Sequence, residues 1–332
     1  MRSRITTTVL AIGTAAAISV LWLNSAFAAP AHQLPVQLSD DNHLMVMTMV
    51  NGEGPFPFIV DTAAASTVVF DNLVDAVNLQ RNPDMPLARI QGASGVTDAP
   101  IVNVGEVAVG DWQFDLPYAV ALPELTSLDE EVFGILGINV LMQQPIGFQL
   151  SSGLINIYEP NSAIDPDTDL TGRWFQTSYD HRPNTGQFMW IEVAVNGVAI
   201  QGIMDTGARR TVINTAAVEA LGFEGTVDNL VEAEPIRGGT NNATPAWNYL
   251  VSTVQFGERV WGSRNLTLAD PSVIAALGMG DQPMIIFGSD FMAEQDFIID
   301  PITRVIWMQG RRSAAFGGTG AAATVENSAA AN

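Results

Sequence analysis

Two Asp-Thr pairs, at Asp61 and Asp205, each stand between apolar runs that are typical of buried strands. A carboxylate next to a buried strand costs free energy unless it is hydrogen-bonded or used. Two carboxylates about 3 Å apart cannot both ionise, so they share one proton. One is then a base and the other an acid at the same pH, and a water between them can attack a carbonyl. If folding brings Asp61 and Asp205 together, the pair predicts hydrolysis without a metal.

The segments around the two aspartates repeat each other. Residues 58–69 and 202–213 share the string Asp-Thr-small-Ala-x-x-Thr-Val, and an Asn-Gly pair typical of a tight hairpin precedes each. Residues 132–139 and 284–290 each place a glycine after two bulky apolar residues, as where a strand passes close to other backbone. The repeat indicates a duplication whose two copies face each other across a pseudo-twofold axis.

Composition excludes several classes of function. The 14 basic residues are all arginine, and 35 acidic residues give a net charge of −21. Nucleic acids and anionic membranes both require clustered positive charge. The chain has no cysteine, and its three histidines (His32, His43 and His181) are too scattered for a multi-histidine metal site. We therefore expect no nucleic-acid partner and no metal, with chemistry carried by carboxylates and hydroxyls.

Residues 1–28 have the pattern of a cleavable signal peptide. Two arginines precede an apolar stretch from Ile5 to Leu23, and Ala26-Phe27-Ala28 has the small-x-small form that predicts cleavage after Ala28. An uncleaved anchor is the alternative, because a stretch of this length can just span a bilayer. We expect a periplasmic or secreted protein that has no contact with the membrane once the signal is removed.

Most of the remaining chain predicts short strands, since β-branched runs alternate with Gly, Pro, Asn and Asp. Examples are Ile101–Val109, Ile191–Val195 and Leu250–Phe256. Helices are expected to be few and short, over 218–221 and 273–277, each ending at a glycine. The fold class is therefore mostly β.

The duplication and the composition together predict the domain boundaries. An N-terminal lobe over 29–160 is followed by a linker over 161–172 that is rich in Pro, Asp and Thr. A C-terminal lobe over 173–312 precedes a tail of Gly, Ala, Ser and Thr at 313–332, which is expected to be disordered.

The two halves resemble the two lobes of an aspartic protease of the retropepsin-like family. Asp-Thr-Gly-Ala at Asp205 and the apolar-apolar-Gly elements at 135–137 and 286–288 carry the resemblance, which covers about residues 35–310. It implies two homologous acid-protease-like lobes, pepsin- or retropepsin-like barrels, with a few short helices. It also implies an endopeptidase that acts on a peptide or protein without a cofactor. Viral relatives build their site from two chains; here both copies lie on one, which implies a pseudo-dimeric monomer.

The resemblance assigns roles by position. Asp61 and Asp205 would be the catalytic dyad, and Thr62 and Thr206 would form a reciprocal hydrogen-bonded pair that joins the two turns. Gly207 would supply a backbone N–H to the carboxylates in a turn with little room for a side chain.

The first copy departs from the family pattern, because Ala63 stands where the family has glycine. A methyl group at a position that requires a positive φ costs on the order of 1 kcal/mol or more. Ala63 therefore keeps a second interpretation open, in which the protein is an inactive protease-like scaffold that binds peptides or a partner protein.

Two glycine-containing segments about thirty residues after the aspartates resemble the family's flaps by position. The first comprises Gly92, Ala93, Ser94 and Gly95, and the second comprises Gly238, Gly239 and Thr240. Both could cover substrate; ordinary surface hairpins are the alternative.

Three residues after the Asp-Thr pairs also carry expectations. Arg209 borders the position of the substrate main chain in viral relatives and could grip a substrate carboxylate or carbonyl; a solvated or ion-paired arginine is the alternative. Ala64 and Ala208 stand where pepsin-like enzymes place a hydroxyl that favours the charged dyad. Its absence predicts a higher pKa for the dyad and activity at mildly acidic to neutral pH.

Overall fold

The structure is a computed structural model that describes residues 30–125, 128, 130–160, 162, 164, 174–183, 185, 187–227, 230–238 and 242–310. The predicted signal peptide (1–28) and tail (313–332) lie outside these residues, as does the predicted linker over 161–172 apart from residues 162 and 164. The described part is mostly β, as the sequence predicts.

The described residues of the first half form twelve strands, two short helices and one 3₁₀ turn. They are β1 (His32–Leu38), β2 (Leu44–Val50), β3 (Glu53–Val60), β4 (Val68–Phe70), α1 (Asp71–Val77), β5 (Gln80–Arg81), β6 (Ala88–Gly92), β7 (Gly95–Ala99), β8 (Ile101–Val109), β9 (Trp112–Leu122), β10 (Gly134–Leu136), α2 (Ile138–Leu141), β11 (Ile146–Gln149), the 3₁₀ turn η1 (Leu150–Ser152) and β12 (Leu154–Ile157).

The second half repeats much of this order. Its elements are β13 (Trp174–Ser178), β14 (Trp190–Val195), β15 (Val198–Met204), β16 (Val212–Ile213), α4 (Thr215–Ala220), β17 (Val231–Arg237), β18 (Ala243–Val251), β19 (Val254–Phe256), β20 (Arg259–Trp261), β21 (Arg264–Leu268), α5 (Ser272–Ala276), β22 (Met284–Phe287), α6 (Ser289–Met292), β23 (Phe297–Asp300) and β24 (Val305–Gln309).

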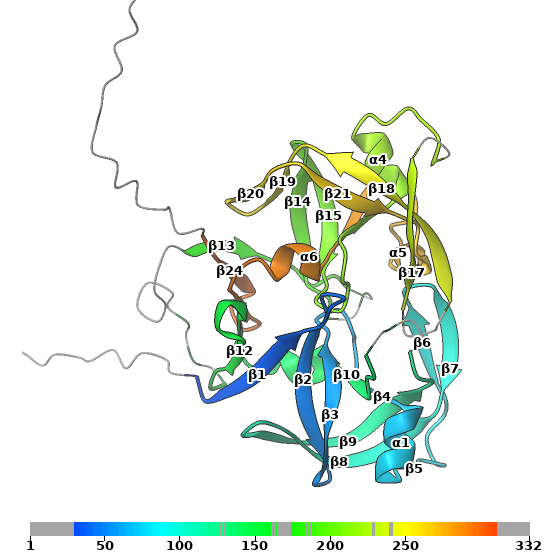
Figure 1. Ribbon diagram of the computed structural model, residues 1–332, viewed down its shortest axis with the longest axis vertical. Helices are drawn as coiled ribbons and strands as arrows, with labels where there is room; N and C mark the ends of the chain where they lie inside the picture. The colour runs from blue at the N-terminus through cyan, green and yellow to red at the C-terminus, as the bar shows by residue number, and fades with distance from the viewer. Residues whose placement is uncertain are drawn as a thin grey trace, which may run out of the picture.

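The two halves share one strand topology, which confirms the two repeated lobes. In the first lobe β10 lies parallel to β3 and antiparallel to β4, and β4 lies parallel to β9. In the second lobe β22 lies parallel to β15 and antiparallel to β16, and β16 lies parallel to β21. Figure 1 shows the first lobe below, in blue to cyan, and most of the second above it, in green to yellow.

The strands that lead to the two aspartates enter through equivalent hairpins. Asn51 and Gly52 have φ values of 51° and 81°, and Asn196 and Gly197 have values of 49° and 82°. Both residues of each loop therefore lie in the left-handed region that a tight two-residue turn requires. The turns fix the register in which β2 pairs with β3 and β14 with β15.

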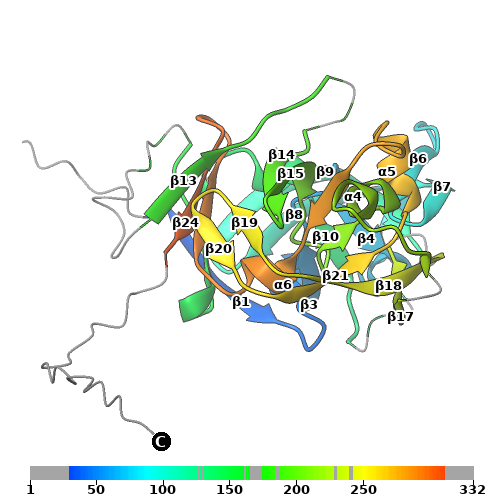
Figure 2. The same ribbon diagram turned by 90° about the horizontal axis from the view of Figure 1, so that it is seen from above.

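One sheet joins the lobes. Its order runs β13-β24-β23-β11-β12-β1 before it continues into the first barrel. The strands of the two lobes meet where β11 pairs with β23 in antiparallel fashion, Gly147 opposite Ile298 and Phe148 opposite Phe297. The two phenyl rings stack with centroids 4.4 Å apart. Figure 2 shows the edge of this sheet, β13 and β24, to one side of both barrels.

One predicted strand is wrong in its extent. The run Leu250–Phe256 is divided between β18 and β19, with a bend at Ser252 and Thr253. The backbone N–H groups of both bend residues donate to the side-chain oxygen of Asn196, at 2.8 and 3.1 Å, instead of to a neighbouring strand. The apolar pattern of residues 250–256 gives no sign of this break, because the side chain that causes it lies in the distant turn between β14 and β15.

Candidate active site

The two aspartates lie at equivalent points, one residue beyond the ends of β3 and β15. The backbone N–H of Asp61 donates to the carbonyl of Leu136 at 3.0 Å, and that of Asp205 donates to the carbonyl of Phe287 at 2.9 Å. Each aspartate is therefore held by the last residue of the parallel strand beside it, from the apolar-apolar-Gly element.

The threonines that follow the aspartates join the two turns by reciprocal hydrogen bonds. The backbone N–H of Thr62 donates to Oγ1 of Thr206, and the N–H of Thr206 donates to Oγ1 of Thr62, both at 3.0 Å. Each hydroxyl then donates into the opposite lobe, Thr62 to the carbonyl of Met204 at 3.1 Å and Thr206 to that of Val60 at 2.7 Å. Both threonines are fully buried, so these four bonds fix the spacing of the two lobes.

The two carboxyl groups occupy matching cradles of backbone N–H groups. Oδ1 of Asp61 accepts from the N–H groups of Ala63 and Ala64, at 2.7 and 2.9 Å. Oδ1 of Asp205 accepts from Gly207 and Ala208, at 2.9 and 3.0 Å. The second oxygen of each carboxyl is not used by these bonds, and the carboxyls hydrogen-bond to each other.

Burial raises the pKa of both carboxyls above the ordinary value of 3.8. The pKa of Asp205 is raised the more, because the charge of Asp61 disfavours a second charge beside it. The backbone N–H groups act in the opposite direction but do not cancel the burial. The pair therefore holds one proton over a range of pH above that of free carboxyls.

The two turns differ at the residue after the threonine. A Cβ at Gly207 would overlap the carboxyl of Asp61, so this position has room for glycine alone. Neither Gly207 nor Ala63 has a positive φ, and the backbone strain expected for an alanine in the first turn is absent. The methyl of Ala63 packs against the apolar cluster of the second lobe that contains Trp190 and Ile203.

The glycines of the apolar-apolar-Gly elements pass directly beneath the two turns. A Cβ at Gly137 would lie 2.7 Å from the carbonyl oxygen of Ala64, and a Cβ at Gly288 would lie 2.7 Å from that of Ala208. Both contacts are closer than real Cβ atoms adopt, so the close approach predicted for these strands is present.

The threonines six residues after each aspartate extend this support. The hydroxyl of Thr67 donates to Asn139 at 3.0 Å, and that of Thr211 donates to Asp290 at 2.7 Å. Each hydroxyl also accepts from the backbone N–H of the glycine beneath the turn. Sequence reasoning did not assign these residues, although the repeated Thr of the shared string was the signal that could have found them.

The hairpin β6–β7 places Gly92, Ala93, Ser94 and Gly95 at its tip. The tip contacts the second lobe: the hydroxyl of Ser94 donates to the carbonyl of Ile236 at 3.1 Å, and the N–H of Val273 donates to the carbonyl of Ala93 at 3.3 Å. Figure 1 shows β6 and β7 beside α5 and β17. Gly238, at the end of β17, lies against Ala93, whereas Gly239 and Thr240 lie outside the described residues.

The two arginines after the second turn are engaged by neighbouring elements. Arg209 forms ion pairs with Asp41 at 2.7 Å and with Glu234 at 2.6 Å. Arg210 donates to the backbone carbonyl of Glu234 at 2.6 Å. Arg209 thus connects the second turn to the β1–β2 turn of the first lobe and to β17. These ion pairs agree with the alternative in which Arg209 is ion-paired within the protein. A contact of Arg209 with substrate remains a prediction.

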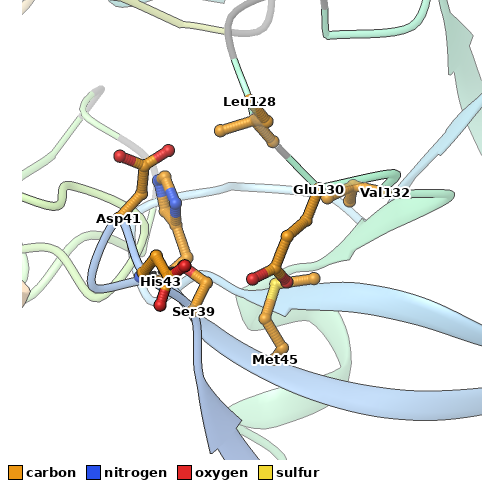
Figure 3. Close-up of a pocket in the computed structure, with 8 residues that line it drawn as sticks. Ser39, Asp41, His43, Met45, Leu128, Glu130 and Val132 are labelled. Carbon is orange, nitrogen blue, oxygen red and sulfur yellow. Dashed lines mark hydrogen bonds between the residues drawn. The ribbon is translucent and has the colours of Figure 1, made fainter.

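A pocket opens beside the first lobe's β1–β2 turn. Its walls include Asp41, His43, Met45, Glu130 and Val132. Figure 3 shows the His43 ring beside the Asp41 carboxylate, with Leu128 and Glu130 on the other side of the pocket. Met45 and Val132 belong to the apolar cluster of the first lobe that also contains Ile59, two residues before Asp61.

Among the described residues, no group of three or more acidic or histidine side chains is placed to hold a metal ion. No helix in the same residues has the length and apolar character to cross a membrane.

Comparison with known proteins identifies the family. The sequence profile of the aspartyl protease family matches residues 46–140 and 191–291, more than half of the chain and once in each lobe. The chain therefore belongs to this family, in its retropepsin-like form.

Solved structures and curated sequences were also compared. Of 416 solved chains that match, one titled "Crystal structure of edgp" has a TM-score of 0.49 and 12% sequence identity. The match covers 86% of this chain and 96% of that one. No curated protein sequence matched.

The reciprocal threonine bonds predict a large effect of removing one hydroxyl. Thr206→Val keeps the shape but leaves the N–H of Thr62 and the carbonyl of Val60 buried without these partners, and we expect a loss of about 2–4 kcal/mol in the free energy of unfolding. Thr206→Ser keeps the hydroxyl and should lose only about 1 kcal/mol. Urea denaturation measures both, and equal stability of the two variants would contradict the role of the hydroxyl.

The raised pKa of Asp205 predicts a specific dependence of stability on pH. An acid whose folded pKa is raised stabilises the fold fully below its unfolded pKa, near 3.8, and this contribution is lost as pH rises through the folded value. Wild type should therefore lose free energy of unfolding above about pH 4, and Asp205→Asn should lose less. Denaturation at several pH values tests this, with exposed Asp75→Asn as the control; parallel curves for wild type and Asp205→Asn would refute it.

Proposed function

We propose that the protein is an aspartic endopeptidase in which Asp61 and Asp205 activate a water molecule to hydrolyse peptide bonds. The observation that carries this proposal is the pair of half-buried aspartates whose carboxyls hydrogen-bond to each other and lie in matching cradles. Family membership supports protease chemistry at the level of the class.

In the proposed mechanism one carboxyl acts as a general base and the other as a general acid. In the singly protonated pair, the ionised carboxyl takes a proton from the water while the protonated one donates to the carbonyl oxygen of the scissile bond. The water oxygen forms the new bond to carbon, giving a tetrahedral diol. When the C–N bond breaks, the protonated carboxyl gives its proton to the amine that leaves. The ionised carboxyl takes a proton from one hydroxyl of the diol, whose oxygen becomes the carbonyl of the product acid, so the pair again holds one proton. The N–H cradles keep the ionised carboxyl in place without neutralising it.

The dyad is supported by apolar packing in both lobes. The residues two before and seven after each aspartate are apolar, and they belong to one apolar cluster in each lobe: Ile59 and Val68 in the first, Ile203 and Val212 in the second. The tip of the hairpin β6–β7 contacts the second lobe, and its role as a flap over the dyad is part of the proposal. The signal-like residues 1–28 support a periplasmic or secreted location.

The structural argument for an inactive scaffold does not hold. It depended on strain at Ala63, whose φ is not positive and whose N–H donates to Asp61 as Gly207 does to Asp205. The scaffold remains as an outcome of the experiment that tests the enzyme.

Each aspartate should be essential for cleavage. We expect the purified protein without residues 1–28 to cut a peptide mixture, and Asp61→Asn or Asp205→Asn to reduce kcat by at least about 1,000-fold, because neither variant can hold the shared proton and a base together. Mass spectrometry of the fragments measures this, with Asp75→Asn as a matched control. Peptide binding without cutting by wild type and both variants would establish the scaffold instead.

The dyad should work at a higher pH than carboxyls held in their charged form. Burial raises both pKa values, so the singly protonated pair is populated at higher pH than for carboxyls held in their charged form. We expect kcat/KM to follow a bell with its maximum between about pH 5 and 7. An optimum near pH 2, as for carboxyls stabilised in their charged form, would show that burial does not control the dyad.

A further inference from the structure

The first residue of α6, Ser289, forms two hydrogen bonds to the turn that carries the second aspartate. Its hydroxyl donates to the carbonyl of Thr206 at 2.8 Å, and its backbone N–H donates to the carbonyl of Ala208 at 2.7 Å. Ser289 and Thr206 are both completely buried. The serine hydroxyl therefore satisfies a carbonyl that has no access to water.

The bond from this hydroxyl lies one peptide unit away from the carboxyl of Asp205. The carbonyl of Thr206 and the N–H of Gly207 belong to the same peptide unit, which is planar. That N–H donates to Oδ1 of Asp205 at 2.9 Å. One rigid unit is thus bound to Ser289 at its oxygen and to Asp205 at its nitrogen, so holding the oxygen also fixes the direction of the N–H.

The second turn needs this support because Gly207 has no side chain. A Cβ at this position would overlap the carboxyl of Asp61, so no methyl group can hold the peptide in place. Glycine also has more backbone freedom than any other residue. In the first turn the equivalent residue is Ala63, whose methyl packs against the apolar cluster of the second lobe that contains Trp190. Packing supports one turn, and a hydrogen bond supports the other.

The residue equivalent to Ser289 in the first lobe is Ile138. It is the first residue of α2, as Ser289 is of α6, and each directly follows the glycine beneath the turn. The backbone N–H of Ile138 donates to the carbonyl of Ala64 at 2.9 Å, which matches the bond from Ser289 to Ala208. The isoleucine side chain has no donor, so it cannot form the counterpart of the bond to the Thr206 carbonyl.

We propose that Ser289 is a positioning residue for Asp205, and that its hydroxyl holds the Thr206–Gly207 peptide so that the N–H of Gly207 stays directed at the carboxyl. This inference rests on the proposed function for its consequence in catalysis. Its structural content, a hydroxyl that orients one N–H of the cradle, can be tested without cleavage.

Ser289→Ala removes the hydroxyl and should reduce turnover. Because the carboxyl of Asp205 is then held by a less well directed N–H, we expect kcat to fall about tenfold, with KM within about twofold since Ser289 is buried. The N–H of Gly207 lowers the pKa of Asp205 against the larger effect of burial. Its displacement should raise that pKa further, in the direction that burial already gives. The alkaline limb of the kcat/KM profile, where the pair loses its shared proton, should move to higher pH.

Two further variants separate this role from a general loss of packing. Ser289→Thr keeps the hydroxyl and should recover most of kcat. Ser263→Ala removes another serine hydroxyl of the second lobe, one that donates to the carbonyl of Val251 at 3.1 Å in the loop between β20 and β21. This control should have the kcat and the pH limbs of the wild type. Equal kcat in wild type and Ser289→Ala, or an equal loss in Ser263→Ala, would contradict the inference.

The backbone amide of Gly207 provides a readout that does not need cleavage. In wild type its proton resonance should follow the titration of Asp205, because this N–H donates to that carboxyl. In Ser289→Ala the response should be smaller, and the amide proton should exchange with solvent at least about tenfold faster. NMR of the isotope-labelled protein without residues 1–28 measures both.

An unchanged response and exchange rate of the Gly207 amide in Ser289→Ala would overturn the inference. If wild type cuts no peptide, the proposed function fails, and this comparison still decides the role of Ser289.

Discussion

Two half-buried carboxyl groups that hydrogen-bond to each other are the constraint on which the rest of this structure depends. Burial costs free energy at any pH where the pair is charged, so the fold must hold the groups together by other bonds. The crossed threonine bonds supply this, because each uses a side chain of one lobe to satisfy backbone of the other. The glycines beneath the turns let the supporting strands approach closely enough to complete the cradle.

The main features of this site could be predicted from the sequence because they repeat. Asp61 and Asp205 stand at equal places in two copies of one string, and a duplicated fold has one axis at which both can meet. The hairpin turns at Asn51-Gly52 and Asn196-Gly197 could also be predicted, since few residues adopt left-handed dihedrals at low cost. In these cases the residue types of a short segment, together with its repetition, were sufficient for the prediction.

Contacts distant in sequence that do not belong to the repeat could not be predicted. Asp41 and Glu234 reach Arg209 from two other elements, and no pattern near Arg209 reveals them. The break between β18 and β19 follows from the side chain of Asn196, more than fifty residues away. The tolerance of Ala63 also required the structure, because the backbone angle of a turn is not fixed by its residue types alone.

The union of β11 with β23 in one sheet has a consequence for how the two halves can diverge. A site assembled from two identical chains depends on their concentration and forces every substitution to appear twice. Here the halves meet within a single molecule, so dilution does not separate them, and each can change alone. Alanine at position 63 in one turn and glycine at position 207 in the other are a difference that two identical chains cannot carry.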